Sequence, residues 1–250
     1  MGIMTEPQPL DTSGAVARVE RILNDRGITP APGGAEPAYR PDEPGHPEYH
    51  RRQRAEVASG RWMAATPPRY QTATATQPGV IAWATAVAAD PGATPSLLIT
   101  GPTGTGKTHE AYGALRLIAE TGPSVFQMIA ITTADLYGLL RPTGAVGAAE
   151  HEMRRVCDVP LLLLDDLGSA KASEWTEEIT YRLINHRYNQ CLPTIFTSNL
   201  PPKAPVDANG RPQGPDLAGA LGERIVSRLA EMTTLVAVTG SDRRRPVSVS

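Results

Sequence analysis

Residues 97–108 read LLITGPTGTGKT, an apolar run that leads into a glycine-rich loop and then a Lys-Thr pair. A short apolar run before such a loop predicts a buried strand, and the residues from Lys107 onward predict a helix. Glycines allow backbone N–H groups to converge on phosphate oxygens, and the amino end of a helix adds a favourable field for an anion. The stretch therefore predicts a phosphate-binding loop between a strand and a helix.

Within this loop, we expect Lys107 to reach the β- and γ-phosphates of ATP and Thr108 to place its hydroxyl on Mg²⁺. Mg²⁺ prefers oxygen ligands and retains waters, so a hydroxyl, phosphate oxygens and a nearby carboxylate suit it. The residues predicted to bind ATP are Gly101, Pro102, Thr103, Gly104, Thr105, Gly106, Lys107, Thr108 and His109.

Two acidic residues, Asp165 and Asp166, follow a second apolar run at 161–164. A buried strand of an open α/β sheet delivers such residues to its carboxyl end, where ligands bind. We expect Asp165 to be the acid on the Mg²⁺ side and Asp166 to orient or polarise the attacking water. A helix-capping role for one of the two acids is the alternative.

Another polar pair, Ser198 and Asn199, follows the apolar run at 194–197. Asn199 can hydrogen-bond the lytic water or the γ-phosphate without adding charge, so we expect it to join the catalytic residues. Its alternative role is that of a turn former before a proline-rich loop.

Helices and strands are predicted to alternate from residue 78 onward. The expected strands are 97–100, 125–131, 161–164, 194–197 and 234–238, and the expected helices are 79–89, 107–120, 133–140, 148–157, 173–191 and 217–230. Short, continuously apolar strands separated by helices are typical of a parallel sheet that is covered on both faces. The predicted fold class is therefore α/β.

The first 66 residues differ in composition from the rest of the chain. Residues 13–26 predict a short amphipathic helix, residues 29–47 a proline-rich tether, and residues 50–65 a basic helix that is kinked near Gly60. The basic face is either simply solvated or a nucleic-acid contact. We expect two parts, an N-terminal segment at 1–66 and the main α/β domain at 67–250.

Composition sets limits on the class of protein. The formal net charge of −2 provides no bulk attraction for nucleic acid, and the two cysteines show no metal-binding spacing, which fits a reducing compartment. No apolar run approaches the roughly 20 residues of a membrane helix, and the N-terminus lacks a signal pattern. A cytoplasmic protein with no membrane contact is expected.

The order of the motifs resembles a known family once residues 222–229, GERIVSRL, are added to it. Together they are similar to the AAA+ ATPases of the DnaC/DnaI helicase-loader group and their relative, the IstB transposition helper. Residues 67–73, PPRYQTA, and residues 181–189, YRLINHRYN, support the resemblance, which covers about residues 67–245. It implies a P-loop AAA+ core.

The resemblance also implies roles for residues outside the motifs. Arg228 corresponds to an arginine finger that acts on ATP held by a neighbouring subunit, with Arg224 as the second candidate, and this use implies a homo-oligomer. For both arginines, an exposed helix charge is the alternative. Arg243 is the favoured candidate for a second phosphate-sensing arginine. Lys171 and Trp175 lie where relatives engage single-stranded DNA, although Trp175 equally suits core packing.

The function implied by the resemblance is ATP-dependent loading of a hexameric replicative helicase onto single-stranded DNA. Two alternatives stay open: an IstB-like ATPase that regulates a transposase, and a nucleotide-switched DNA-binding module with little turnover. The sequence departs from the family in two ways. Asp166 stands where many relatives have Glu, which is consistent with slow hydrolysis, and the cysteine-bearing N-terminal zinc module of some loaders is absent.

Overall fold

A computed structural model describes residues 40–141, 147–208, 211, 213–240 and 242. The chain forms two units, Met1–Tyr49 and His50–Ser250. The predicted amphipathic helix at 13–26 lies outside the described residues, as does most of the proline-rich tether. The predicted boundary at residues 66 and 67 stays a prediction, but the compact second unit already begins at His50.

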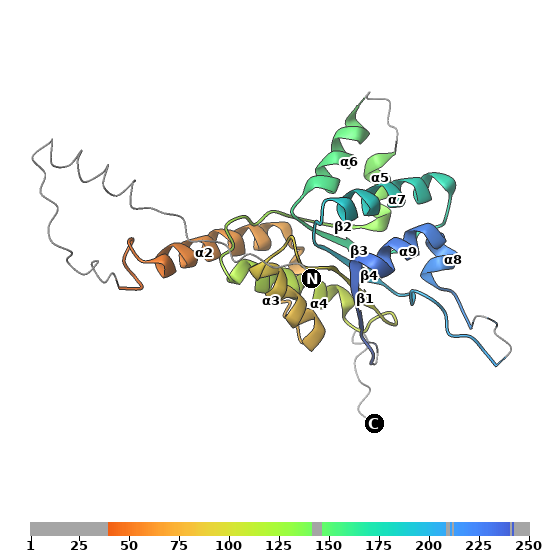
Figure 1. Cartoon of the computed structure of the whole chain (residues 1–250), viewed down its shortest axis with the longest axis horizontal. Coiled ribbons are helices and arrows are strands. Elements are labelled where there is room, and N and C mark those ends of the chain that lie inside the picture. The colour runs from red at the N-terminus through yellow and green to blue at the C-terminus, as the bar shows by residue number, and fades with distance from the viewer. Residues whose placement is uncertain (1–39, 142–146, 209–210, 212, 241, 243–250) are drawn as a thin grey trace, which may run out of the picture. The chain divides into compact units, whose positions relative to one another are not determined.

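The centre of the second unit is a five-stranded parallel sheet with the order β2-β3-β4-β1-β5 (Figure 1). Its strands are β1 (Ser96–Thr100), β2 (Met128–Thr132), β3 (Leu161–Asp165), β4 (Thr194–Ser198) and β5 (Thr233–Ala237). Strand β1 pairs with β4 on one side and with β5 on the other, so it lies inside the sheet. The predicted parallel α/β sheet is confirmed.

Helices cover both faces of this sheet (Figure 1). One face carries α2 (Pro47–Ala65), α3 (Pro78–Ala89) and α4 (Lys107–Glu120), with the short 3₁₀ turn η1 (Pro68–Tyr70) beside them. The other face carries α5 (Thr133–Leu140), α6 (Ala148–Asp158), α7 (Glu174–Asn189), α8 (Leu217–Leu221) and α9 (Glu223–Met232).

Successive side chains of each strand point to opposite faces of the sheet and so pack into two separate hydrophobic cores. Leu97 and Ile99 of β1 pack into the core on the α2–α4 side, whereas Leu98 packs into the core on the other side. Every residue of β1 is buried, because successive side chains point to opposite faces and both faces are covered. The continuous apolar runs in the sequence are a direct result of this arrangement.

Helix α2 is attached to the sheet domain by its basic residues. Arg51 and Arg54 donate to the carbonyls of Thr121 and Gly122, just beyond the carboxyl end of α4, at 3.4 and 3.0 Å, and Arg61 donates to the carbonyl of Phe126 at 3.0 Å. These carbonyls have no intrahelical partner, so guanidinium donors suit them. The basic character of α2 therefore has an intramolecular explanation.

Three predicted elements differ in the structure. Helix α2 runs through Gly60 without a break, and the strand expected at 125–131 begins only at Met128. The helix expected at 217–230 is two helices, because Gly222 adopts a φ of 89° and a ψ of 149° between them. A side chain on Gly222 would also lie 2.9 Å from Oε1 of Glu177. Apolar periodicity continues across this glycine, which is why the sequence pattern did not reveal the break.

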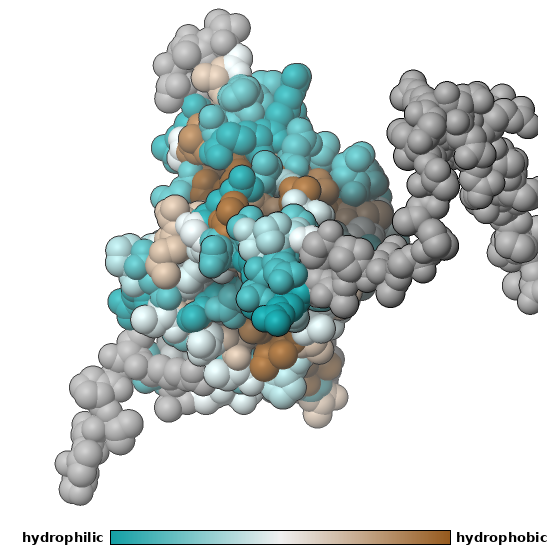
Figure 2. Space-filling model, turned by 90° about the vertical axis from the view of Figure 1, so that its left-hand side faces the viewer, coloured by the Kyte–Doolittle hydropathy of each residue, from teal (hydrophilic) through white to brown (hydrophobic). Residues whose placement is uncertain are grey.

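Figure 2 shows the side of the molecule that lies to the left in Figure 1. Hydrophobic residues there form small groups among hydrophilic ones. Within the described ranges, no helix combines the length and apolar character that crossing a bilayer requires.

Candidate nucleotide site

The phosphate loop connects β1 to α4 at the carboxyl edge of the sheet. Gly104 and Gly106 adopt φ values of 84° and 100°, and Gly106 is the N-cap of α4. The loop borders a cavity of about 290 Å³. Its lining residues are Arg69, Tyr70, Thr103, Gly104, Gly106, Lys107, Thr108, His109, Asp166 and Asn199. The structure thus brings predicted loop, acid and amide residues from three strand ends to one cavity.

Lys107 is the buried cation of this cavity, with 5% of its surface exposed. Its Nζ donates to the carbonyl oxygens of Gly101 and Pro102, each at 2.8 Å, and to Oδ1 of Asn199 at 2.7 Å. The predicted lysine and the predicted asparagine are therefore in direct contact, although 92 residues separate them in sequence.

Asp165 lies beside Thr108 at the end of β3. The Thr108 hydroxyl donates to both carboxylate oxygens, at 3.0 and 3.1 Å, and the Thr197 hydroxyl donates to Oδ1 at 2.5 Å. Burial raises the pKa of Asp165, and the neighbouring charge of Asp166 adds to this, while the bonds from Thr197 and Thr108 oppose it. A carboxylate with an adjacent hydroxyl is the kind of oxygen pair that suits Mg²⁺ together with phosphate.

Thr197 was not among the predicted site residues. Besides bonding Asp165, its hydroxyl oxygen accepts the backbone N–H of Asp166 at 3.0 Å. A single hydroxyl from β4 therefore orients both acids at the end of β3. The sequence feature that could have identified Thr197 as a site residue is its position at the end of an apolar strand, next to Ser198 and Asn199.

Asp166 has an unusual backbone conformation, with a φ of 56°. This region is uncommon outside glycine, although Asp adopts it more readily than most residues, and such positions cluster at functional sites. Its side chain lines the cavity, whereas the helix that follows is capped by Ser173 through a capping box with Thr176. The helix-capping alternative is therefore excluded for Asp166.

Arg69 and Tyr70 also line the cavity and were missed as site residues. The Tyr70 ring stacks on Tyr112, with centroids 4.8 Å apart and planes 12° apart. Burial raises the pKa of Tyr112 to about 12, so the ring stays neutral. Of the stacked pair, only Tyr70 lines the cavity, and an aromatic face beside a phosphate loop suits stacking on a nucleobase. The resemblance of residues 67–73, PPRYQTA, to the family was the sequence feature that could have identified Arg69 and Tyr70.

The segment that carries Tyr70 is fastened to α4 immediately after Thr108. His109 Nε2 accepts the N–H of Thr74 at 3.3 Å. Glu110, only 1% exposed, accepts the N–H groups of Thr76 and Gln77 at 2.8 and 3.1 Å and the Thr76 hydroxyl at 2.5 Å. The first turn of α4 therefore holds both the phosphate loop and the aromatic side of the cavity.

The remaining predicted residues lie outside this cavity. The guanidinium carbons of Arg224 and Arg228 lie 4.4 and 4.6 Å above the rings of Tyr181 and Tyr188 on α7. Trp175 is partly buried and meets the Tyr137 ring edge-on at 5.8 Å, while Lys171 is exposed. Arg243 lies outside the described residues.

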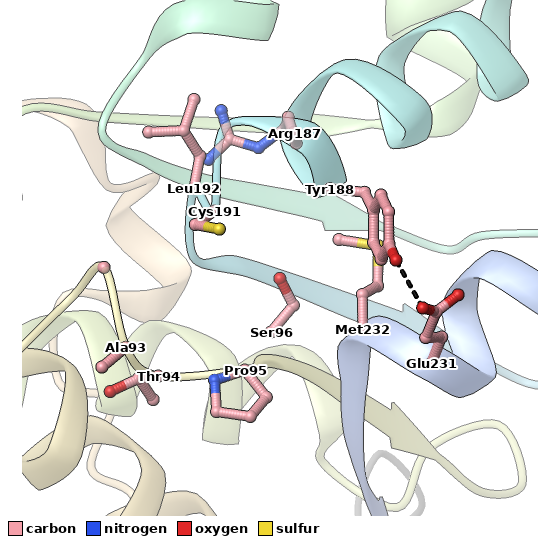
Figure 3. Close-up of a pocket in the computed structure, with 11 residues that line it drawn as sticks. Ala93, Thr94, Pro95, Ser96, Arg187, Tyr188, Cys191, Leu192, Glu231 and Met232 are labelled. Atoms are coloured by element: carbon pink, nitrogen blue, oxygen red, sulfur yellow. Dashed lines mark hydrogen bonds between the residues drawn. The ribbon is translucent and has the colours of Figure 1, made fainter. Parts of the chain in front are cut away.

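A second cavity, of about 210 Å³, lies at the opposite edge of the sheet, where β1 and β4 begin (Figure 3). Arg187, which is fully buried, forms part of its wall and donates to the carbonyls of Cys157, Val159 and Pro193 at 2.7 to 3.0 Å. Tyr188 and Glu231 meet across its other side through a hydrogen bond from the tyrosine hydroxyl.

The sequence profile of the family described as IstB-like ATP binding protein matches residues 92–245. The chain belongs to this family. The matched residues extend from just before β1 through the acids, Asn199 and both α9 arginines, so the IstB-like assignment covers every motif of the cavity downstream of Tyr70. Binding of ATP is the property that the family description carries.

Known proteins similar to this IstB-like chain include helicase loaders and an insertion-sequence protein. The replicative helicase loader DnaI of Bacillus subtilis is 24% identical over 151 residues, which are 60% of this chain and 48% of DnaI. A putative ATP-binding protein of insertion sequence IS5376 from Geobacillus stearothermophilus is 31% identical over 105 residues, 42% of this chain and 40% of that protein. The chain thus spans about half the length of the curated relatives it matches.

Solved structures agree on the fold. A crystal structure of the DnaC helicase loader matches with a TM-score of 0.56 and 27% identity, covering 69% of this chain and all of that one. Replication initiator DnaA, bound to AMPPCP and single-stranded DNA, matches with a TM-score of 0.55 and 20% identity over 70% of this chain and 51% of that one, a likeness of fold alone. The IstB-like chain has the AAA+ fold.

Proposed function

We propose that this protein hydrolyses ATP at the cavity between the phosphate loop and the acids of β3. The observation that carries this proposal is the joining of Lys107 to Asn199 and of Thr108 to Asp165 at one edge of the sheet. A binding site alone needs only the loop. A second acid and a neutral amide at the same edge supply what phosphoryl transfer to water requires, which is orientation of the water.

Each residue then has a stated task. Lys107 neutralises phosphate charge, Thr108 and Asp165 would hold Mg²⁺, and Asp166 with Asn199 orients water. Mg²⁺, when bound, supplies charge neutralisation between the phosphates. Tyr70 and Arg69 form the side of the cavity that suits the base and ribose. Arg228, with Arg224 as second candidate, acts on ATP held by a neighbouring copy, as a guanidinium stabilises charge on the transferred group.

The work driven by this ATPase is, in our proposal, the loading of a hexameric replicative helicase onto single-stranded DNA. Support comes from DnaI and DnaC, whose names are those of helicase loaders. Residues 1–66 would grip the helicase, and Lys171 with Trp175 would contact DNA through phosphate and base stacking. A transposition ATPase is the second candidate, favoured by the family description and by the 31% identity to the insertion-sequence protein.

The enzymatic proposal is tested at two of the three lysines of the chain, Lys107 and Lys203. We expect Lys107→Ala to lower the ATPase rate on the order of 100-fold, the loss typical of removing a charge-stabilising donor. Lys203→Ala, at an exposed loop position, is the matched control and should hydrolyse ATP like the wild type. An unchanged rate in Lys107→Ala would refute the proposal.

The partner is tested by affinity purification of the full chain with ATP present, followed by identification of the bound protein. Recovery of a replicative helicase supports loading, and recovery of a transposase supports the second candidate. The DNA contact is tested with Lys171→Ala, which should bind single-stranded DNA more weakly. The slope of log binding constant against log salt concentration should also fall by the amount that corresponds to about one phosphate contact. Binding that is unaltered at every salt concentration would contradict the assignment of Lys171.

A further inference from the structure

Helices α7 and α9 pack side by side and form two matched pairs of residues. On α9, Arg224 and Arg228 are one turn apart, and on α7 their ring partners Tyr181 and Tyr188 are two turns apart. Both guanidinium groups lie within the 6 Å at which a cation is attracted to an aromatic face. Each arginine is therefore held against α7 by a ring.

The two pairs differ in how the ring itself is fixed. The hydroxyl of Tyr188 donates to Oε1 of Glu231 across the gap between the helices (Figure 3). This bond is the main cause of a raised pKa for Tyr188, so the hydroxyl keeps the proton that it donates. Among the described residues, the structure shows no corresponding bond for the hydroxyl of Tyr181.

The contact with the Tyr188 ring leaves the edge of the Arg228 guanidinium open to approach. A ring occupies the flat face of the guanidinium, whereas its N–H groups project from the edge. Oε2 of Glu231 lies 3.6 Å from Nη1, which makes an ion pair longer than a hydrogen bond. The Arg228 side chain keeps 35% of its surface exposed, so a ligand can approach that edge.

We propose that Tyr188, held by Glu231, is a positioning residue for Arg228. An arginine has many rotamers, and their restriction opposes any interaction that the guanidinium makes. A ring that fixes the guanidinium plane beforehand lowers this cost in the reaction step. The inference rests on the proposed function, in which Arg228 acts on the ATP of a neighbouring copy. It adds two residues to that site: Glu231, which holds the hydroxyl of Tyr188, and Tyr188, whose ring holds Arg228.

The test is a double-mutant cycle in the full-length protein. Loss of one exposed cation–π contact predicts a kcat about two- to five-fold lower in Tyr188→Leu, with the affinity for ATP unchanged. In the Arg228→Ala background, the same substitution should have no further effect, because no guanidinium remains to be positioned. Glu231→Gln, which keeps an acceptor for the hydroxyl, should retain near wild-type kcat, and Glu231→Leu should resemble Tyr188→Leu.

Tyr181→Leu is the matched control, and its effect on kcat should add in full to that of Arg228→Ala. If Tyr188→Leu does not fold, Tyr188→Phe keeps the ring, removes the bond to Glu231 and should lower kcat about two-fold. The inference is overturned if kcat is unchanged in these variants or if Tyr188→Leu and Arg228→Ala are additive. A normal kcat in Arg228→Ala would overturn the inference and leave Arg224 as the candidate finger, whereas a normal rate in Lys107→Ala would show that the proposed function itself fails.

Discussion

At the scale of single residues, the two cysteines occupy opposite environments. Cys157, near the end of α6, is 4% exposed and lies in the hydrophobic core, whereas Cys191 is exposed just after α7. Burial raises the pKa of the Cys157 thiol to about 11. A thiol in such surroundings is unreactive because the thiolate is the nucleophile.

We therefore predict that a thiol reagent modifies only Cys191 in the native protein and both cysteines after denaturation.

The raised pKa of Cys157 also makes stability depend on pH. The folded protein holds the Cys157 proton more tightly than the unfolded chain does. Its contribution to stability is thus complete below pH 9.0 and disappears as the pH rises to about 11. The loss should be about 2 kcal/mol. The measurement is the free energy of unfolding across this pH range. Cys157→Ala is the control: its free energy of unfolding should fall less with pH, because it has no thiol at this position to titrate. An equal decline in both proteins would contradict the assignment.

At the scale of elements, the junction between α4 and residues 74–77 fastens the segment that follows Tyr70 to the helix that carries Lys107. Gly113 allows the backbone to come this close, because a Cβ at this position would lie 2.2 Å from the Ala75 nitrogen. Glu110 then supplies acceptors to the N–H groups at the start of α3. Both residues belong to the helix that carries Lys107.

Replacing Gly113 with Ala should destabilise the protein by about 1–3 kcal/mol, since backbone rather than a side chain must move. The same variant should bind ATP more weakly, as residues 70–77 are displaced from the cavity. Gly60→Ala is the matched control, a glycine inside α2 with no atom within 4 Å of the added carbon. It should stabilise the helix by about 0.5–1 kcal/mol. Chemical denaturation and nucleotide titration measure both effects, and equal stability changes in the two variants would refute the explanation.

The elements were largely predictable because each buried strand is continuously apolar and each long helix lies between turn residues. The edge strands were harder to delimit. Val125 and Phe126 are apolar and suggested an earlier start, yet Val125 is 60% exposed and β2 begins at Met128. The break at Gly222 depends on backbone angles and on Glu177, which the local pattern does not contain.

The cavity was predictable only where its residues follow strand ends in short motifs. Lys107, Asp165 and Asn199 could be recognised in this way. Arg69 and Tyr70 could not be placed from their spacing, because a 3₁₀ turn far upstream brings them to the loop. Arg187 appeared to be one more polar residue of α7, although it is fully buried among carbonyls at the far edge of the sheet.

At the scale of the whole molecule, the cavity and the α9 arginines are distinct features of the described structure. Neither Arg224 nor Arg228 lines the nucleotide cavity, and both guanidinium groups lie over tyrosines of α7. Under the proposed function, a complete site therefore requires two copies of the chain. Isolated copies would bind ATP but hydrolyse it slowly.

Mixing two inactive variants tests this arrangement. Lys107→Ala keeps Arg228, and Arg228→Ala keeps the phosphate loop, so some mixed interfaces contain both groups. With random assembly, roughly a quarter of the interfaces should be complete and the ATPase rate should recover to that extent. A mixture of Lys107→Ala with the double variant should not recover. Absence of recovery in the first mixture, with both proteins folded, would argue against action between copies.

Helix α4 has a further, mechanical consequence. Its first turn carries Lys107, and the carbonyls just beyond its last turn receive Arg51 and Arg54 of α2. Fourteen residues make a rod about 21 Å long. The two ends of this rod are therefore tied to different features, the phosphate loop at its first turn and α2 just beyond its last turn.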